Sequence, residues 1–188
     1  MKRIGILGDI GAGKSYVSQN FGYPVFNADK VVGNLYKKNK KIFIKIKKIL
    51  PKFIHSFPIS KDEIIKAILA NDINLKKIVK IIHSEVRIEM NKFLKKNRNK
   101  RIIILDIPLL LENKINKRGD ILIFVKSKKT DILKRLKKRN NFDYKLFNKF
   151  RKIQLSLDYK MKKSHFTIKN NFTKKSVKRD INYILGKI

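Results

Sequence analysis

Residues 8–15, GDIGAGKS, constrain the possible fold more than any other segment of this chain. They fit the pattern Gly-x-x-x-x-Gly-Lys-Ser, whose fixed positions are Gly8, Gly13, Lys14 and Ser15. The short apolar run at 3–7 predicts a buried strand, and the run at 15–21 predicts the start of a helix. Strand, glycine loop and helix in this order are the context in which the pattern forms a phosphate-binding loop.

Each residue type in the pattern serves the binding of phosphate. Glycines let the backbone turn tightly and bring its N–H groups against phosphate oxygens. The helix N-terminus adds a partial positive charge at the same point. Lys14 can reach the β- and γ-phosphates, and the hydroxyl of Ser15 can bind Mg²⁺. The residues predicted to hold a nucleotide through this loop are Gly8, Ile10, Gly11, Ala12, Gly13, Lys14, Ser15 and Tyr16.

Length and composition favour one compact domain with a subdomain inserted into it. The chain has 188 residues, of which 43% are hydrophobic, and this suffices for a core. No apolar run approaches the ~20 residues that span a bilayer. The N-terminus leads straight into the first strand and leaves no room for a signal peptide. The chain has no cysteine, which excludes disulfides and thiolate metal sites. We expect a cytoplasmic protein with no membrane partner.

The formal net charge of +34 is extreme and suggests a polyanionic partner such as nucleic acid. However, lysine outnumbers arginine, the basic residues are spread over the whole chain, and isoleucine and asparagine are abundant. Because A/T-rich codons encode Lys, Asn and Ile, the charge is better explained by genome composition than by a selected surface. In either case, such a surface should bind RNA weakly, non-specifically and with strong salt dependence.

A second short strand is predicted at 25–26, after the turn signal Gly22-Tyr23-Pro24. It brings Asp29 to the carboxyl end of the sheet, where ligands bind in open α/β sheets. Asp29 would then lie at the place where a substrate hydroxyl could meet the bound phosphates. Helix capping by Asp29 or Asn27 fits the same spacing equally well.

Residues 30–97 follow a mostly helical pattern, in which Ser60-x-x-Glu63 predicts a capping box. The apolar positions between 75 and 93 mark a long amphipathic helix. So much helix between two strands exceeds an ordinary crossover, and we interpret it as an inserted helical subdomain that holds a second substrate. His83 lies near the apolar stripe of the long helix, where a structural role is favoured over a catalytic one.

The run RIIILD at 101–106 is the strongest strand signal in the chain. It ends in Asp106, which resembles the second signature of phosphate-loop proteins, where the carboxylate lies near Mg²⁺. An aspartate at a strand end is also common in turns, but the phosphate loop favours the metal role. Further strands are predicted at 121–125 and 166–168, with a closing helix at 176–185.

Residues 130–139 are predicted to be helical, with Arg135 and Arg139 four positions apart and therefore on one face. Residues 143–163 form a further helical stretch that is dense in charge. The charged residues of such helices usually do no more than face solvent. In an enzyme that transfers a phosphoryl group, a basic mobile flap would exclude water and neutralise charge, and its arginines could stabilise the transition state.

Several separated segments together resemble the dephospho-coenzyme A kinase family. They are GDIGAGKS at 8–15, FNADK at 26–30, IIHSEVR at 81–87, LDIPLLLEN at 105–113 and LKRLKKRN at 133–140. The last is followed at the family's spacing by Gln154, Lys160 and Asn170. The resemblance covers essentially the whole chain. The phosphate loop alone is shared with many NTPases, whereas the combination is far more specific.

The resemblance implies an α/β three-layer fold of P-loop kinases, with a five-stranded parallel sheet in the order 2-3-1-4-5. It implies a single domain with a helical coenzyme A-binding insert at about 30–99 and a lid at about 138–163. ATP, with Mg²⁺ held by Ser15 and Asp106, would give its γ-phosphate to the 3′-hydroxyl of the ribose of dephospho-coenzyme A.

The resemblance also assigns roles to single residues. Asp29 matches the acidic residue that accepts the hydroxyl proton, and Lys14 and Arg139 match residues that contact the phosphates. Arg135 is assigned to nucleotide binding. We expect a monomer or weak oligomer with no specific nucleic-acid partner.

The chain departs from the family pattern at Asp9, Asn27, Ser84 and Ser164-His165. Asn27 stands where the family carries a carboxylate, so one acid near the metal is missing. None of these departures removes Lys14, Ser15, Asp29 or Arg139. Another nucleoside or nucleotide kinase on the same scaffold is the main alternative. A nucleic-acid-binding protein that uses the loop as a switch is a third reading.

Overall fold

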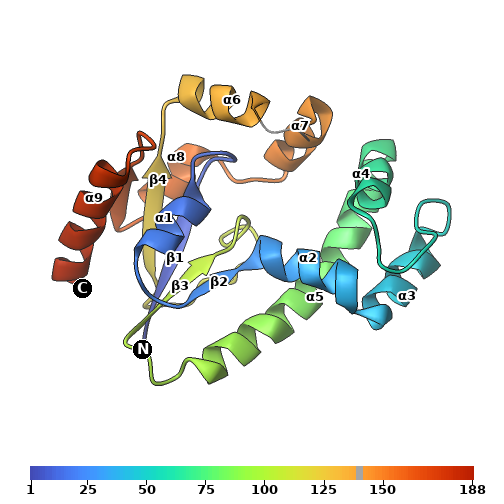
Figure 1. The fold of residues 1–188 in the computed structure, drawn as a ribbon, viewed down its shortest axis with the longest axis horizontal. Helices are drawn as coiled ribbons and strands as arrows, with labels where there is room; N and C mark the ends of the chain where they lie inside the picture. Colours follow the sequence, from blue (N-terminus) through green and yellow to red (C-terminus); the bar gives the residue numbers. More distant parts are fainter. Residues whose placement is uncertain (139–141) are drawn as a thin grey trace. The chain divides into compact units, whose positions relative to one another are not determined.

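A computed structural model describes residues 1–138 and 142–188 and divides them into two compact units (Figure 1). The sheet unit comprises Met1–Asn27, Asn97–Phe142 and Arg151–Ile188. The helical unit comprises Ala28–Lys96 and Asp143–Phe150. Within the described residues, no helix is long and apolar enough to cross a membrane.

A parallel five-stranded sheet forms the centre of the sheet unit. Its strands are β1 (Lys2–Gly8), β2 (Val25–Asn27), β3 (Ile102–Asp106), β4 (Ile121–Lys126) and β5 (Phe166–Lys169). They lie in the order β2-β3-β1-β4-β5, which confirms the predicted order. The strands are short apolar runs because both faces of a parallel sheet are covered, and every residue of β3 is buried.

Helices cover both faces of this sheet. They are α1 (Lys14–Asn20), α8 (Leu157–Lys162) and α9 (Lys174–Lys187), whereas α6 (Lys129–Lys137) lies beyond the carboxyl ends of the strands (Figure 1). The connection from β1 to β2 runs toward one edge of the sheet, and the connection from β4 to β5 runs toward the other edge. Because crossovers between parallel strands are right-handed, these two opposite directions place α1 and α8 on opposite faces of the sheet. Figure 1 shows α1 in front of the sheet and α8 behind it. The α9 helix packs against α1 and β5.

The helical unit contains α2 (Ala28–Lys38), α3 (Lys40–Ile49), α4 (Lys61–Ala70), α5 (Asp72–Lys96) and all but the last two residues of α7 (Tyr144–Lys152). The predicted capping box is confirmed, because Ser60 accepts from the Glu63 N–H and Glu63 accepts from the Ser60 N–H. The predicted amphipathic helix is α5, whose buried residues are Leu75, Ile78, Ile82, Val86 and Met90. An ion pair joins Lys149 of α7 to Asp72 of α5.

The charged stretch at 143–163 is two helices rather than the one that the pattern predicted. The α7 helix ends at Lys152, and α8 begins after Ser156, whose hydroxyl accepts from the Tyr159 N–H at 3.2 Å. Between them, the Leu155 N–H donates to the carboxylate of Glu112 at 3.0 Å. A new cap and a long-range hydrogen bond therefore take the backbone out of the helical path.

A buried ion pair joins α8 to the loop that follows β3. The Lys160 ammonium lies 2.7 Å from Oε1 of Glu112, and their side chains are only 1% and 9% exposed. Gln154 accepts a second hydrogen bond from Lys160 at 3.1 Å. Removing one partner of such a pair leaves an uncompensated charge in the interior.

We therefore expect Lys160→Met to lower the free energy of unfolding by about 3 kcal/mol. Denaturant unfolding followed by circular dichroism measures this change. The double variant Lys160→Met, Glu112→Gln is expected to recover part of the loss, because it removes the stranded charge. A single variant within ~1 kcal/mol of the parent chain would contradict the assigned cost.

Candidate active site

The segment between β1 and α1 is folded as a phosphate-binding loop. The Lys14 ammonium reaches back across it and donates to the carbonyls of Gly8 and Asp9, at 3.2 and 2.8 Å. The Ala12 N–H donates to the Asp9 carbonyl at 3.2 Å. The loop thus forms a compact turn, and the Lys14 ammonium lies at the carboxyl end of β1, where it could contact bound phosphates.

Two side chains from distant parts of the sheet unit brace this loop. The carbonyl of Ala12 accepts from the Ser127 hydroxyl at 3.0 Å and from the Asn170 amide at 2.8 Å. Ser127 follows β4 and Asn170 follows β5, so both come from the carboxyl edge of the sheet. Neither contact was predicted from the sequence, although each residue stands two positions after a predicted strand, at 121–125 or 166–168.

Close approach explains two of the loop glycines. Gly13 has φ of 88°, and a Cβ there would lie 2.4 Å from the side-chain nitrogen of Asn170. Gly11 has φ of 83°, and a Cβ there would lie 3.0 Å from both Ile132 and Leu136 of α6. Any larger residue would push away the elements that surround the loop, so the loop and α6 are fitted to each other.

The α6 helix carries Arg135, one of the residues predicted to bind nucleotide. Its guanidinium carbon lies 4.1 Å from the ring centroid of Phe172, in the turn after β5. The structure therefore brings Arg135 into the neighbourhood of the phosphate loop. Phe172 was not singled out from the sequence, and its only signal was its place after the asparagine pair at 170–171.

Asp106 ends β3 at the same edge of the sheet and is 2% exposed. Asn27, its partner in the strand register, donates its amide N–H to Asp106 at 2.5 Å. Ser15 and Asp106 supply oxygen atoms, the ligands that Mg²⁺ prefers. Within the described residues, no three acidic, histidine or cysteine side chains gather as a metal cage. The donors fit Mg²⁺, which usually takes one or two carboxylates and completes its shell with water and phosphate.

Two further residues singled out from the sequence, Asp29 and His83, belong to the helical unit. Asp29 is the second residue of α2 in the helical unit and is exposed, so it lies inside the helix and is not its N-cap. Arg139 lies outside the described residues. Partial burial and the positive charge of Arg87 lower the pKa of His83, which favours a neutral, structural histidine on α5.

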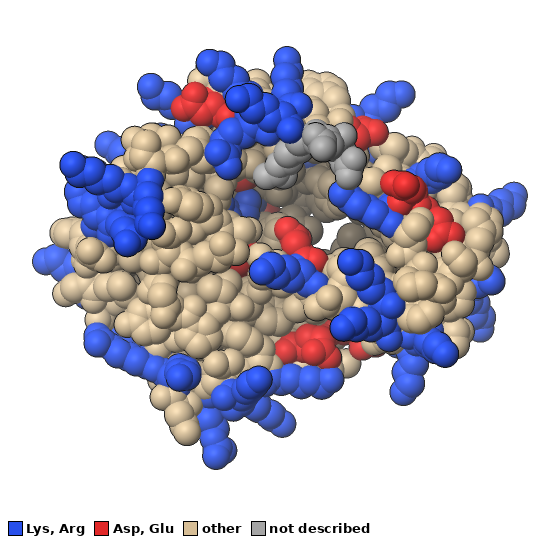
Figure 2. Space-filling view, in the orientation of Figure 1, with Lys and Arg blue, Asp and Glu red and all other residues tan. Residues whose placement is uncertain are grey.

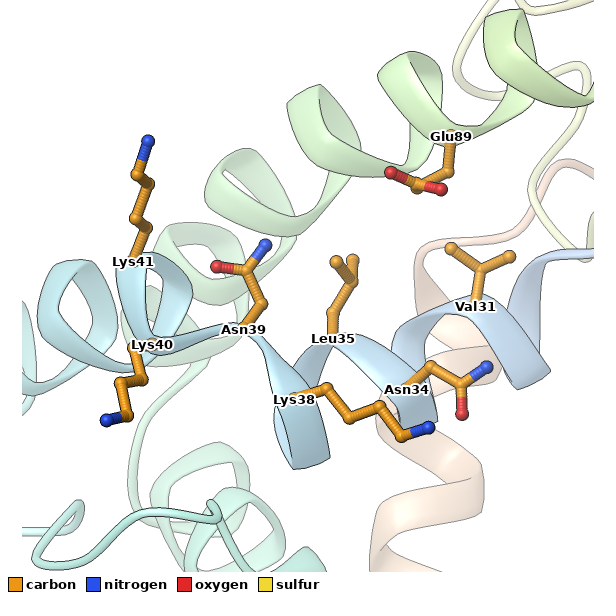
Figure 3. Close-up of a pocket in the computed structure, with 8 residues that line it drawn as sticks. All are labelled: Val31, Asn34, Leu35, Lys38, Asn39, Lys40, Lys41 and Glu89. Carbon is orange, nitrogen blue, oxygen red and sulfur yellow. The ribbon is translucent and has the colours of Figure 1, made fainter.

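A pocket of about 480 Å³ lies in the helical unit between α2, α3 and α5 (Figure 3). Three lysines line it, but Figure 3 shows the side chains of Lys38, Lys40 and Lys41 pointing in different directions. Glu89 adds a carboxylate to the lining. We assign no phosphate site here, because the ammonium groups do not converge. Figure 2 likewise shows lysine and arginine side chains spread over the visible face rather than gathered in one patch.

The fold and the loop together define a P-loop kinase. The profile of the family described as dephospho-CoA kinase matches residues 2–176. The chain belongs to the dephospho-CoA kinase family, and its enzyme class is that of ATP-dependent kinases.

A curated relative supports the family assignment, and two solved structures support the fold. The chain is 36% identical to the dephospho-CoA kinase of Wolbachia pipientis wMel over 179 residues, which cover 93% of this chain and 91% of the relative. Its fold is similar to that of TT1252 from Thermus thermophilus, with a TM-score of 0.80, 22% identity and coverage of 100% and 97%. The dephospho-CoA kinase from Campylobacter jejuni matches with a TM-score of 0.65, 19% identity and the same coverage.

Proposed function

We propose that this chain transfers the γ-phosphate of ATP to the ribose 3′-hydroxyl of dephospho-CoA, giving CoA and ADP. The observation that carries the proposal is the family match over residues 2–176 in a chain whose phosphate loop is intact. The braced loop and the Lys14 ammonium supply the amide donors and positive charge that the phosphates require. We further propose a monomer or weak oligomer that acts in the cytoplasm without a specific nucleic-acid partner.

The proposed roles follow from the chemistry of each side chain. Lys14 neutralises the charge that develops on the transferred phosphoryl group. Arg135 contacts the nucleotide from α6, and Arg139 contacts the phosphates. Residues 138–163 act as a lid that excludes water. The segment at about 30–99 holds dephospho-CoA.

Asp29 accepts the proton of the attacking hydroxyl. A carboxylate is suited to this because it is ionised at neutral pH and carries no donor that would compete. Ser15 and Asp106 would hold Mg²⁺. When bound, Mg²⁺ supplies positive charge against the β- and γ-phosphate oxygens.

A coupled assay for ADP formation tests the proposal with purified protein, ATP, Mg²⁺ and dephospho-CoA. AMP, dTMP and GMP each replace dephospho-CoA as the acceptor in a separate reaction. We expect kcat/KM for dephospho-CoA to exceed the others by orders of magnitude, because the site recognises polar groups of its acceptor. Folded protein that phosphorylates another acceptor more efficiently would overturn the proposed substrate.

RNA binding is tested separately across ~50–200 mM salt. We expect any binding to an unrelated RNA to collapse over this range, because 48 lysines and arginines act through unspecific charge. Filter binding or fluorescence anisotropy measures it. A complex with one RNA that persists at the upper salt concentration would show a specific nucleic-acid partner instead.

A further inference from the structure

The turn between β5 and α9 places an aromatic ring against the phosphate loop. A Cβ added to Gly13 would lie 3.3 Å from Cε1 of Phe172, so the edge of the ring borders the loop. The face of the same ring carries the guanidinium of Arg135, 4.1 Å from the ring centroid. Phe172 therefore connects the phosphate loop to the nucleotide-binding arginine of α6.

The backbone at Phe172 is in a conformation that a bulky residue rarely adopts. Its φ is 64°, in the left-handed region. The Phe172 N–H donates to Oδ1 of Asn170 at 2.9 Å, and the amide of Asn170 donates to the carbonyl of Ala12 at 2.8 Å. One buried asparagine thus fixes both the turn and the phosphate loop. Strained residues persist only where their surroundings hold them, and they cluster at ligand sites.

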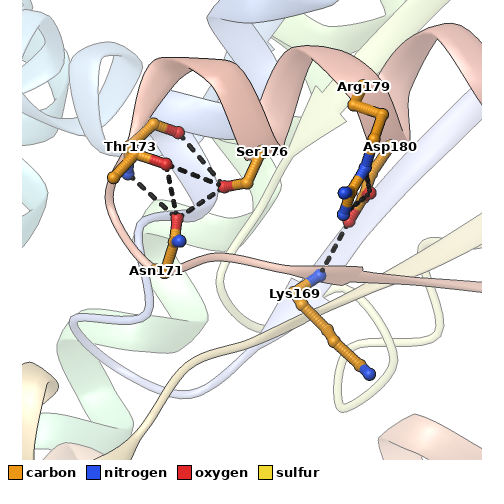
Figure 4. Close-up of polar contacts among 6 residues, drawn as sticks. All are labelled: Lys169, Asn171, Thr173, Ser176, Arg179 and Asp180. Carbon is orange, nitrogen blue, oxygen red and sulfur yellow. Dashed lines mark hydrogen bonds and ion pairs between the residues drawn. The ribbon is translucent and has the colours of Figure 1, made fainter.

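The other side of the turn is also held by hydrogen bonds (Figure 4). Oδ1 of Asn171 accepts from the N–H of Thr173 at 3.1 Å, from its hydroxyl at 2.8 Å and from the hydroxyl of Ser176 at 2.5 Å. These contacts tie the turn to the start of α9. The ring of Phe172 is therefore mounted on a backbone fixed on both sides.

Arg135 is anchored at its backbone and accessible at its tip. Ile132 and Leu136, on the same helix, lie 3.0 Å from a Cβ added to Gly11, while the Arg135 side chain is exposed. A planar guanidinium has two faces that stack on aromatic rings. Because Phe172 covers one side of the Arg135 guanidinium and the residue is exposed, a flat, electron-rich ligand can approach the guanidinium from the other side.

We propose that Phe172 is a positioning residue for the base of ATP. Its ring holds the Arg135 guanidinium in place, so that the second guanidinium face receives the purine while the loop binds the phosphates. Phe172 acts through Arg135 and does not itself touch the reacting atoms. This inference rests on the proposed function, in which Arg135 contacts the nucleotide.

Titration calorimetry of Phe172→Leu with two ligands tests the inference. ATP carries a base and phosphates, whereas inorganic tripolyphosphate carries phosphates alone. The dissociation constant for ATP is expected to rise roughly fivefold, the size of a lost guanidinium–aromatic contact. The dissociation constant for tripolyphosphate is expected to stay within about twofold, because the loop that binds it is unchanged. In turnover, KM for ATP should rise and KM for dephospho-CoA should not.

Phe172→Gly separates positioning from stability. Glycine adopts φ of 64° without strain, so the melting temperature is expected to stay at or near that of the parent chain, while ATP affinity falls as in Phe172→Leu. Combining Phe172→Leu with Arg135→Ala is expected to weaken ATP binding no further than Arg135→Ala alone. Tyr183→Leu is the matched control, because it also removes an aromatic ring that a cation lies over. The Lys187 ammonium lies 5.9 Å from the ring centroid of Tyr183, which is exposed on α9.

Two results would overturn the inference. If ATP and tripolyphosphate lose affinity together, Phe172 merely supports the loop. If neither loses affinity, the ring does not position Arg135 for the base. Both outcomes are measured as binding constants, so they do not depend on which acceptor the enzyme phosphorylates. Failure of the proposed function would appear instead as absent turnover of dephospho-CoA by the parent chain.

Discussion

Lys14→Ala is expected to lower kcat for the phosphorylation of dephospho-CoA by about 10³-fold. The ammonium lies in the phosphate loop, where it is held by the carbonyls of Gly8 and Asp9. It would there stabilise charge on the transferred phosphoryl group, and alanine offers no replacement. Initial rates at saturating ATP and dephospho-CoA measure the loss, while circular dichroism checks that the variant is folded.

Lys92→Ala is the matched control for this experiment. Lys92 is 68% exposed and pairs with Glu89 on the surface of α5, and such pairs contribute little. The control should keep the parent rate. A Lys14→Ala protein that is folded and retains more than about a tenth of the parent kcat would remove the phosphate loop from the chemistry.

Asp29→Asn is expected to lower kcat roughly 10²- to 10⁴-fold, the usual contribution of a general base. Asparagine has nearly the same shape but cannot accept the hydroxyl proton. KM for dephospho-CoA should change much less than kcat, because the loss concerns the transition state. Steady-state kinetics with both substrates varied separates the two constants.

Asp62→Asn controls for the helical position of Asp29. Both aspartates are exposed and lie in the first turn of a helix, α2 or α4. Losing a negative charge beside a helix N-terminus costs only a fraction of a kcal/mol in stability, so Asp62→Asn should keep full activity. Equal activity of Asp29→Asn and Asp62→Asn would reduce Asp29 to a helix-stabilising residue.

The sheet and the phosphate loop were predictable because their signals are local. Each strand is a short apolar run, and the loop pattern stands between a strand and a helix. The Ser60–Glu63 capping box is likewise confined to four residues and is confirmed. The break before α8 was missed, because Ser156 lacks the acidic partner that would mark a capping box and the stabilising contact comes from Glu112.

The surroundings of the loop could not be predicted, because they depend on contacts between distant positions. The carbonyl of Ala12 accepts hydrogen bonds from residues 115 and 158 positions away. The pairing of Arg135 with Phe172 likewise depends on how α6 and the β5–α9 turn meet. No spacing in the sequence indicates such contacts, since they form only when the strands are assembled in their final order.

The amide of Asn27 also affects the charge at the carboxyl edge of β2 and β3. Asn27 donates its amide N–H to Asp106 at 2.5 Å, whereas a second carboxylate at this position would place a like charge beside the first. An amide supplies a hydrogen bond and carries no charge, so electrostatic repulsion between these two side chains does not oppose the packing of β2 on β3.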